Sequence, residues 1–367
     1  MTTYRRRPRG SVIIRFDLEE QEAETTTSDK LDLSKYSKIS NSRISRWNTC
    51  KRAHHYAFNE KLERKKPPAP LYKGKIIHEC IEELINDRDW RPVLEKYTEE
   101  YNNMFEEEKA EYGDLPTELR IIMEGYEKRY EDDGLTYLEK DGKKAEHEIQ
   151  LVISEEAAPE SDKEGIVYVG KIDAIAQDEQ DRVWLMDHKT FKKLPDEDFR
   201  WTNQQMNLYT WAMPQIGFPK PDGVIWDYIR TKVPTKPKLL KSGGLSKNKN
   251  IDTTYETYYN EIIANGLDPA DYEEFLETLK GNEDNFYRRI TLPTRENIIQ
   301  PIVKDMINTA KEIHYLGETL KTRNLGRHCT FCPFKQICQV ELMGGDSEFI
   351  KKSEYRPSTY HVNVEEE

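Results

Sequence analysis

Apolar residues recur at helical spacing in the run GKIIHECIEELIND, residues 74–87. Side chains three and four positions apart share one face of a helix, so this run predicts an amphipathic helix with one buried face. Cys80 belongs to that face and is interpreted as a small apolar core residue. The other apolar members of the face are Ile76, Ile77, Ile81, Leu84 and Ile85. Related spacing predicts further helices in residues 90–140, 199–213, 252–282 and 295–320.

The pattern changes after Glu146 to short runs in which apolar and polar residues alternate. These runs are HEIQLVI, IVYVGKIDAIA and RVWLMDHKT, and GVIWDYIR follows at 223–230. A period of two is typical of strands, and short strands separated by turn-rich stretches favour an antiparallel sheet. We therefore predict an α/β protein in which a central sheet is flanked by helices.

The same patterns divide the 367-residue chain into three parts. Residues 1–38 are polar and are expected to form a flexible arm with one short strand at Ser11 to Phe16. Residues 39–345 are expected to form one large domain with a helical insertion at about 88–140 of two exposed helices, and residues 346–367 a polar tail. No stretch reaches the roughly 18 apolar residues of a membrane helix. No GxxxxGK[ST] loop is present, which argues against a built-in ATP motor.

Charge changes this picture only locally. The net charge of −12 argues against general adhesion to polyanions. Residues 230–250, however, contain seven Lys or Arg and no acid. This basic loop is either a solvated loop or a segment that contacts phosphates.

Candidate chemistry begins with Asp187 and Lys189, which share one face of the strand in RVWLMDHKT. A tight reversal near residues 178–180 would place Asp173 opposite Asp187, or within one place of it. Two carboxylates this close repel unless a cation lies between them, and hard oxygen ligands suit Mg²⁺ or Mn²⁺. Lys189 could then orient a water or offset charge on a phosphate. The alternative is an ordinary Asp–Lys surface pair.

Two further features bear on this site. His78 lies at the shoulder of the predicted helix, where it could reach the sheet and ligate a metal, or simply pack. Gln205 and Tyr209, four residues apart on the helix after the hairpin, present one polar face toward the strands.

The five cysteines are an odd number at uneven spacing, which favours a reducing, cytoplasmic compartment over a disulfide framework. RHCTFCPFKQIC places three thiols close together, and Cys50 could supply a fourth ligand. The three are Cys329, Cys332 and Cys338. Four thiolates accept Zn²⁺ or an iron–sulfur cluster, and unrelated buried cysteines are the remaining alternative.

Five motifs in order resemble the RecB-type branch of the PD-(D/E)XK nucleases. They are SNSRISRWNTC, GKIIHE, GKID, DHKT and QMNLY, and they span residues 40–210. The resemblance implies a restriction-endonuclease-like core with a central mixed sheet. It also implies that His78, Asp173 and Asp187 hold Mg²⁺ or Mn²⁺ and that Lys189 is the catalytic lysine, with Gln205 and Tyr209 supporting the site or the DNA strand. The chain departs from the family at Lys51, where proline is usual, and at His188, where an aromatic residue is common.

The cysteine arrangement extends the resemblance to about residue 340, toward the iron–sulfur subset that includes AddB-type subunits and CRISPR adaptation nucleases. It implies a [4Fe–4S] cluster, with Zn²⁺ as the alternative, joining Cys50 to the C-terminal trio as a structural clip. The implied activity is that of a DNA exonuclease in recombination, repair or phage DNA processing. An endonuclease or RNase of the same fold and a non-catalytic nucleic-acid or assembly module are the rivals.

The expected partner is DNA, through its ends or single strands, with a helicase or recombination protein as a further possible partner. Trp47 and Tyr56 flank the cysteine helix and could stack bases, although Trp47 also suits a core position. Phosphate contacts are expected from Arg43, Arg46, Lys51, Arg52, Lys232, Lys236, Lys238 and Lys241.

Overall fold

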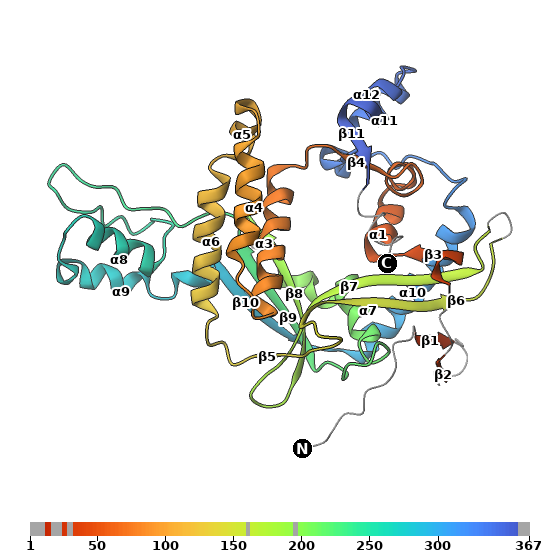
Figure 1. Cartoon of the computed structure of the whole chain (residues 1–367), viewed down its shortest axis with the longest axis horizontal. Helices are drawn as coiled ribbons and strands as arrows, with labels where there is room; N and C mark the ends of the chain where they lie inside the picture. Colours follow the sequence, from red (N-terminus) through yellow and green to blue (C-terminus); the bar gives the residue numbers. More distant parts are fainter. Residues whose placement is uncertain (1–11, 16–23, 28–31, 159–161, 194–196, 359–367) are drawn as a thin grey trace.

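The centre of the molecule is a seven-stranded sheet with helices on both faces (Figure 1). The structure is a computed structural model that describes residues 12–15, 24–27, 32–158, 162–193 and 197–358. The strand order is β10-β9-β8-β7-β3, and β5 and β6 also pair with β7. The strands are β3 (Tyr36–Ile39), β5 (Thr136–Tyr137), β6 (Ala145–Ser154), β7 (Gly165–Gln177), β8 (Val183–Phe191), β9 (Gly223–Arg230) and β10 (Tyr287–Pro293).

The sheet is mixed, as the family resemblance implies. The antiparallel prediction is correct for β6–β7 and β7–β8 and wrong for β8–β9, which are parallel. The reason is the helix α7 (Gln204–Ala212), which carries the chain back across the sheet so that β9 enters in the direction of β8. β3 is also parallel to β7, so the sheet begins before the expected domain boundary at residue 39.

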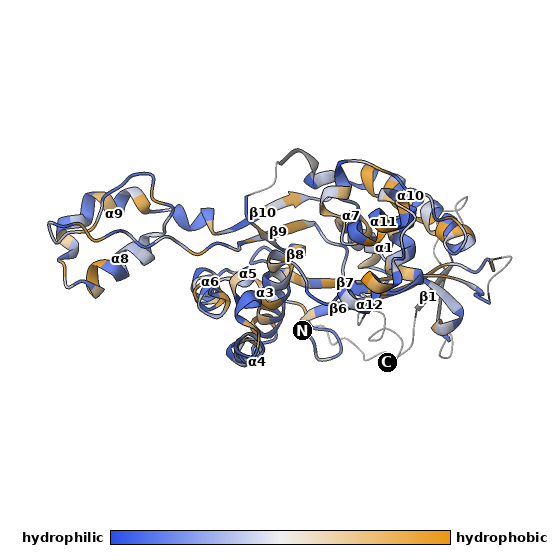
Figure 2. Cartoon of the chain, turned by 90° about the horizontal axis from the view of Figure 1, so that it is seen from above, coloured by the Kyte–Doolittle hydropathy of each residue, from blue (hydrophilic) through white to orange (hydrophobic). Residues whose placement is uncertain are grey.

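Alternation along β8 divides its side chains between two cores. Val183 and Leu185 pack into the core that includes α7 and α10 (Glu296–Leu316), while Trp184 and Met186 pack into the core beneath α3 (Ala69–Ile85). Figure 2 shows the two helical layers on opposite sides of the strands. The residues that follow on β8 inherit this alternation, which fixes the face on which each one lies.

The expected insertion at 88–140 forms three helices rather than two. Trp90 and Leu94 are fully buried against α3, so these helices complete a core and are not simply exposed. The sequence pattern missed this because Tyr-rich buried faces resemble polar ones. The helices are α4 (Arg91–Asn102), α5 (Glu106–Tyr112) and α6 (Leu115–Arg129).

A separate lobe projects from the β9–β10 connection (Figure 1). It contains α8 (Tyr255–Ala264) and α9 (Glu273–Leu279), which share a small core of their own. The basic loop at 230–250 leads into this lobe.

The N- and C-terminal parts meet at one end of the sheet. α1 (Asn41–Thr49) and α2 (Lys51–His54) lie near α11 (Lys335–Leu342), α12 (Glu348–Glu354) and the pair β4 (Leu62–Arg64) and β11 (Tyr355–Pro357). The strand expected at Ser11 to Phe16 is β1 (Val12–Arg15), paired with β2 (Glu24–Thr27). The expected C-terminal tail is structured as far as residue 358, and residues 359–367 lie outside the described part. Every helix in the described segments is too short or too polar to cross a membrane.

Candidate functional site

The candidate active site lies where β7 and β8 separate. Their register ends at Ala174 opposite Met186, so Asp173 and Asp187 are the next residues on the two strands. The Asp173 carboxylate accepts a hydrogen bond from the backbone N–H of His188, with 2.8 Å between Oδ2 and N. The structure therefore brings the two acids together at the fork in the sheet.

Lys189 completes this group from the same face of β8. Its Nζ lies 3.0 Å from Asp187 Oδ1 and 2.8 Å from Oδ2. The Asp187 carboxylate is almost entirely buried, and its Oδ2 makes no hydrogen bond despite the nearby ammonium group. The arrangement is thus more enclosed than an ordinary surface pair, because the acid is desolvated and one oxygen lacks a directed donor.

Burial and neighbouring charge shift the pKa values of both groups. Burial raises the pKa of Asp187 to about 6, Lys189 opposes this rise, and Asp173 adds to it. Burial alone would lower the pKa of Lys189, but the two carboxylates outweigh it and the net direction is upward. Lys189 is therefore a cation at neutral pH, suited to offsetting negative charge.

His78 reaches the fork from α3. Its Nδ1 lies 3.9 Å from Asp173 Oδ2, and about a third of its side chain is exposed. Burial, reinforced by His188, lowers the pKa of His78 to about 4. The imidazole is therefore neutral near pH 7, the form that can ligate a metal. Gly74, one helical turn earlier, allows this approach, because a Cβ there would lie 2.9 Å from Thr190 Oγ1.

Gln205 and Tyr209 lie beside the fork on α7. Gln205 Nε2 donates to the Tyr209 hydroxyl at 3.2 Å, and the backbone N–H of Lys171 donates to the same oxygen at 3.4 Å. Gly170 permits this contact, since a Cβ there would lie 2.9 Å from the Tyr209 ring. The pair therefore fastens α7 to the strand that carries Asp173.

Two features near the fork were not predicted from sequence. Glu146 on β6 has a positive φ of 57°, and burial together with Asp173 raises its pKa to about 7. Asp227 is completely buried on β9, where it contacts His188. An acid within the apolar run GVIWDYIR is unusual and could have drawn attention to Asp227. Nothing in the alternating pattern indicated the bend at Glu146.

The described side chains contain no group of three or more His, Cys, Asp or Glu already arranged around a metal position. The residues nevertheless suit a hard cation. Asp187 has a buried oxygen without a hydrogen bond, and Asp173 adds a second carboxylate at the same place. A cation would offset the repulsion that contributes to the raised pKa of Asp187.

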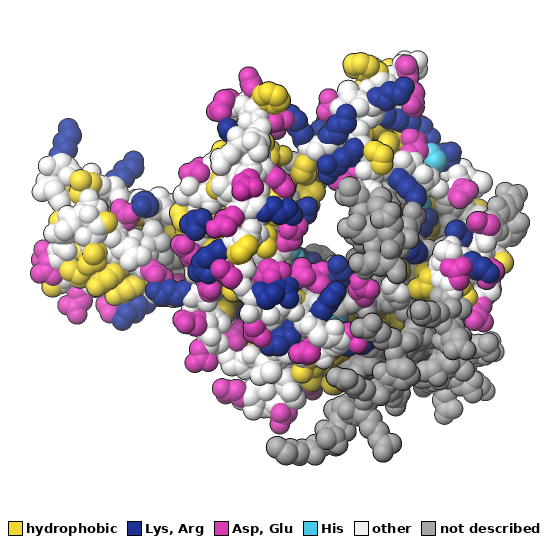
Figure 3. Space-filling model, in the orientation of Figure 1, with side chains coloured by type: hydrophobic (Ala, Val, Ile, Leu, Met, Phe, Trp, Pro, Cys, Tyr) yellow, Lys and Arg dark blue, Asp and Glu magenta, His cyan; other side chains and the backbone are white. Residues whose placement is uncertain are grey.

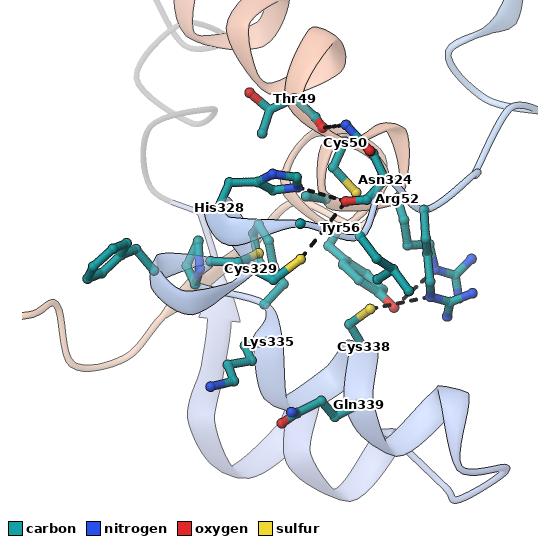
Figure 4. Close-up of a pocket in the computed structure, with 18 of the residues that line it drawn as sticks. Thr49, Cys50, Arg52, Tyr56, Asn324, His328, Cys329, Lys335, Cys338 and Gln339 are labelled. Atoms are coloured by element: carbon teal, nitrogen blue, oxygen red, sulfur yellow. Dashed lines mark hydrogen bonds between the residues drawn. The ribbon is translucent and has the colours of Figure 1, made fainter.

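The four predicted cysteine ligands line one cavity of about 360 Å³, shown in Figure 4. Cys50 lies at the break between α1 and α2, Cys329 ends up in a short 3₁₀ turn, and Cys338 projects from α11. Burial raises the pKa of the Cys332 thiol, and Arg323 Nε donates to Cys338 Sγ at 3.3 Å. Cys80 lies elsewhere, fully buried in the core beneath α3, as expected.

Several side chains near this cavity that were predicted to contact DNA are buried or bonded to other parts of the protein. Trp47 and Tyr56 are each 1% exposed, so the stacking role expected for them is wrong and both are core residues. Arg43 donates to the Lys38 carbonyl at 2.7 Å and to His54, and Arg52 pairs with Glu341. Arg43 and Arg52 are therefore held by partners within the protein.

The remaining basic residues differ in their surroundings. Arg46 lines the cysteine cavity, and Lys51 pairs with Glu312 at 3.3 Å. In the basic loop, Lys232 pairs with Asp252 at 2.7 Å and Lys236 with Glu261 at 2.5 Å. Lys238 and Lys241 are exposed. Figure 3 shows basic side chains at the upper edge of the projecting lobe and both acidic and basic side chains along its lower edge.

Comparison with known proteins identifies the superfamily of this chain through a family model. One solved structure, described as the crystal structure of SSO0001, is similar over 82% of this chain and 85% of its own, with 12% identity and a TM-score of 0.31. No curated protein matches the chain. The family model for the PD-(D/E)XK nuclease superfamily matches residues 38–339, which include the fork and the four cavity cysteines. The chain belongs to the PD-(D/E)XK nuclease superfamily.

Proposed function

We propose that this protein is a divalent-metal-dependent DNA nuclease whose active site is the fork between β7 and β8. The observation that carries the proposal is the group of Asp173, Asp187 and Lys189 at the fork, in which the Asp187 carboxylate is buried. Membership of the superfamily supports a metal-dependent nuclease in general. The choice of DNA rests on the RecB-type resemblance of the motifs.

Asp173 and Asp187, with His78 beside them, would hold Mg²⁺ or Mn²⁺. When bound, such an ion stabilises charge on the phosphoryl group and lowers the pKa of water. Lys189 would orient the attacking water or offset charge on a phosphate oxygen, as its raised pKa keeps it protonated. Gln205 and Tyr209 would fix the strand that carries Asp173, and Tyr209 would stay protonated because burial raises its pKa to about 12.

We infer that the enzyme acts as an exonuclease in DNA recombination, repair or phage DNA processing, in the cytoplasm. The inference follows the motif order of the RecB-type branch. A helicase or recombination partner is compatible with it, since the chain has no phosphate-binding ATPase loop.

We propose a [4Fe–4S] cluster held by Cys50, Cys329, Cys332 and Cys338. The shared cavity supports this, because all four cysteines line it. A cluster takes one thiolate for each iron, so its ligands need not converge on one point, whereas a single Zn²⁺ requires thiolates at about 2.3 Å. Iron content and visible absorption of anaerobically purified protein distinguish the two. Zinc without iron in the natively loaded protein would refute the cluster.

The test of function is digestion of end-labelled linear DNA, circular DNA and RNA with and without Mn²⁺. An exonuclease degrades linear DNA progressively from an end and leaves covalently closed circles intact. Cleavage of circles would favour the endonuclease, and preference for RNA the RNase. If no substrate is degraded at any Mn²⁺ concentration, the fold serves a non-catalytic role.

A further inference from the structure

A row of charged and polar side chains crosses the sheet directly behind the active site. His188, Asp227 and Arg289 are register partners on the neighbouring strands β8, β9 and β10. His188 Nδ1 lies 2.8 Å from Asp227 Oδ2, and Arg289 Nε lies 3.4 Å from Asp227 Oδ1. All three project toward the α3–α6 side of the sheet, opposite to Asp187 and Lys189.

Helix α6 and the segment after it make further contacts with the row. The Tyr126 hydroxyl donates to Asp227 Oδ2 at 2.5 Å, and Arg289 pairs with Asp133. The Arg289 guanidinium also stacks on Tyr130, 3.7 Å from the ring centroid. Asp227 is 0% exposed and His188 2%. Buried charges need partners. His188 Nδ1 contacts Asp227 Oδ2, whereas His188 Nε2 and Asp227 Oδ1 have no hydrogen-bond partner among the described residues. The row therefore favours the ring orientation in which Nδ1 faces Asp227.

His188 connects this row to the active site through its own backbone. Its side chain is held by Asp227, while its backbone N–H donates to Asp173 Oδ2 at 2.8 Å. The paired register of β7 and β8 ends at Ala174 and Met186. The hydrogen bond from His188 to Asp173 therefore connects the two strands just beyond their last paired residues. The contact between Asp227 and the His188 imidazole thus sets the position of the His188 backbone N–H, which in turn orients the Asp173 carboxylate.

We propose that His188 is a positioning residue, anchored by Asp227, that holds the Asp173 carboxylate in the orientation needed for divalent-cation binding. This inference rests on the proposed function of the fork. A row that served only to fix strand register would contribute to stability alone.

Three variants separate the two roles. His188→Phe keeps a ring of similar size but removes the donor to Asp227, and His188→Asn restores a donor near the position of Nδ1. Mn²⁺ affinity is measured by calorimetry. The values of kcat and KM are measured on single-stranded DNA, and folding is checked by circular dichroism. Loss of groups that orient metal ligands costs about 10–100-fold in metal affinity or activity. We expect His188→Phe to lose Mn²⁺ affinity and kcat in that range with KM almost unchanged, and His188→Asn to recover most of both.

Tyr126→Phe is the third variant and covers the case in which His188→Phe does not fold. Its control is Tyr287→Phe, which removes an equally buried hydroxyl at the same α6–sheet contact, one that bonds the Ile122 carbonyl and not Asp227. We expect Tyr126→Phe alone to weaken Mn²⁺ binding. Equal effects of the two tyrosine variants, or wild-type Mn²⁺ affinity in folded His188→Phe, would overturn the proposal. If the wild-type protein binds Mn²⁺ but does not cleave DNA, the proposed function is refuted. The Mn²⁺ affinities of the variants would then still decide the role of His188 in metal binding.

Discussion

The fork and the cysteine cavity bring distant residues together in different ways. Asp173, Asp187 and Lys189 lie on neighbouring strands, and backbone hydrogen bonds and register place them whether or not an ion is bound. The cavity cysteines lie on helix ends, a 3₁₀ turn and a short helix, and they join Cys50 to a segment almost three hundred residues later. Strand register therefore positions the fork, whereas the cavity relies on contacts between distant helices and turns, such as the pair of Arg52 with Glu341.

The largest expected effect is at the fork. Replacing Lys189 with alanine removes the ammonium group that pairs with Asp187. Loss of such electrostatic stabilisation lowers kcat by about 10²–10³-fold. Folding should be little affected, since the strands position the site. The measurement is the rate of single-strand degradation at saturating Mn²⁺. Lys220→Ala is the control, because Lys220 precedes the distant end of β9 and pairs with exposed Glu296. Equal rates for the two variants would contradict the assignment.

The next effect is at the cavity and concerns stability. Cys338→Ser should abolish the iron absorbance and lower the free energy of unfolding, since a link between distant parts of a chain is worth about 2–4 kcal/mol. Chemical denaturation of the loaded protein checks this. Cys80→Ala is the matched control and should keep the absorbance, because Cys80 lies outside the cavity. An intact chromophore in Cys338→Ser would exclude that residue as a ligand.

A pH-dependent effect distinguishes the fork from the cavity. The pKa of Asp187 is raised to about 6, so between about pH 4 and 6 the folded protein binds a proton that the unfolded chain releases. This group's contribution to the free energy of unfolding therefore falls as pH rises through that window. Asp187→Asn should melt at a higher temperature than wild type at pH 7.5, and the difference should shrink toward pH 4. A constant difference across the range would show that Asp187 is not desolvated as described.

The smallest effect is on the projecting lobe. Lys238 and Lys241 are exposed, whereas Lys232 is paired with Asp252, so the first two are better placed to contact phosphates. Removing one phosphate contact should reduce the salt-dependence slope of DNA binding by about 1. Fluorescence anisotropy of labelled DNA at several salt concentrations measures this. If Lys238→Ala and Lys241→Ala show the same slope as wild type, the loop is a solvated loop that does not contact phosphates.

The sequence predicted those features that depend on local periodicity. The α3 helix, the β7–β8 hairpin and the common face of Asp187 and Lys189 follow from spacings of 3.6 and 2, and all are present. The direction of β9 did not follow, because a crossover helix decides it. The burial of Trp47 also depends on which elements cover α1. The row behind the site escaped prediction since its members lie on three strands and meet only through sheet register.

The metal-binding role of the fork is tested most directly by titrating Mn²⁺ into the wild-type protein and into Asp173→Asn, with calorimetry at pH 7.5. We expect wild type to bind Mn²⁺ and Asp173→Asn to bind it much more weakly, with the fold of the variant, judged by circular dichroism, retained. Equal Mn²⁺ binding by the two folded proteins would place the ion elsewhere and contradict the assignment of the fork as the metal-dependent active site.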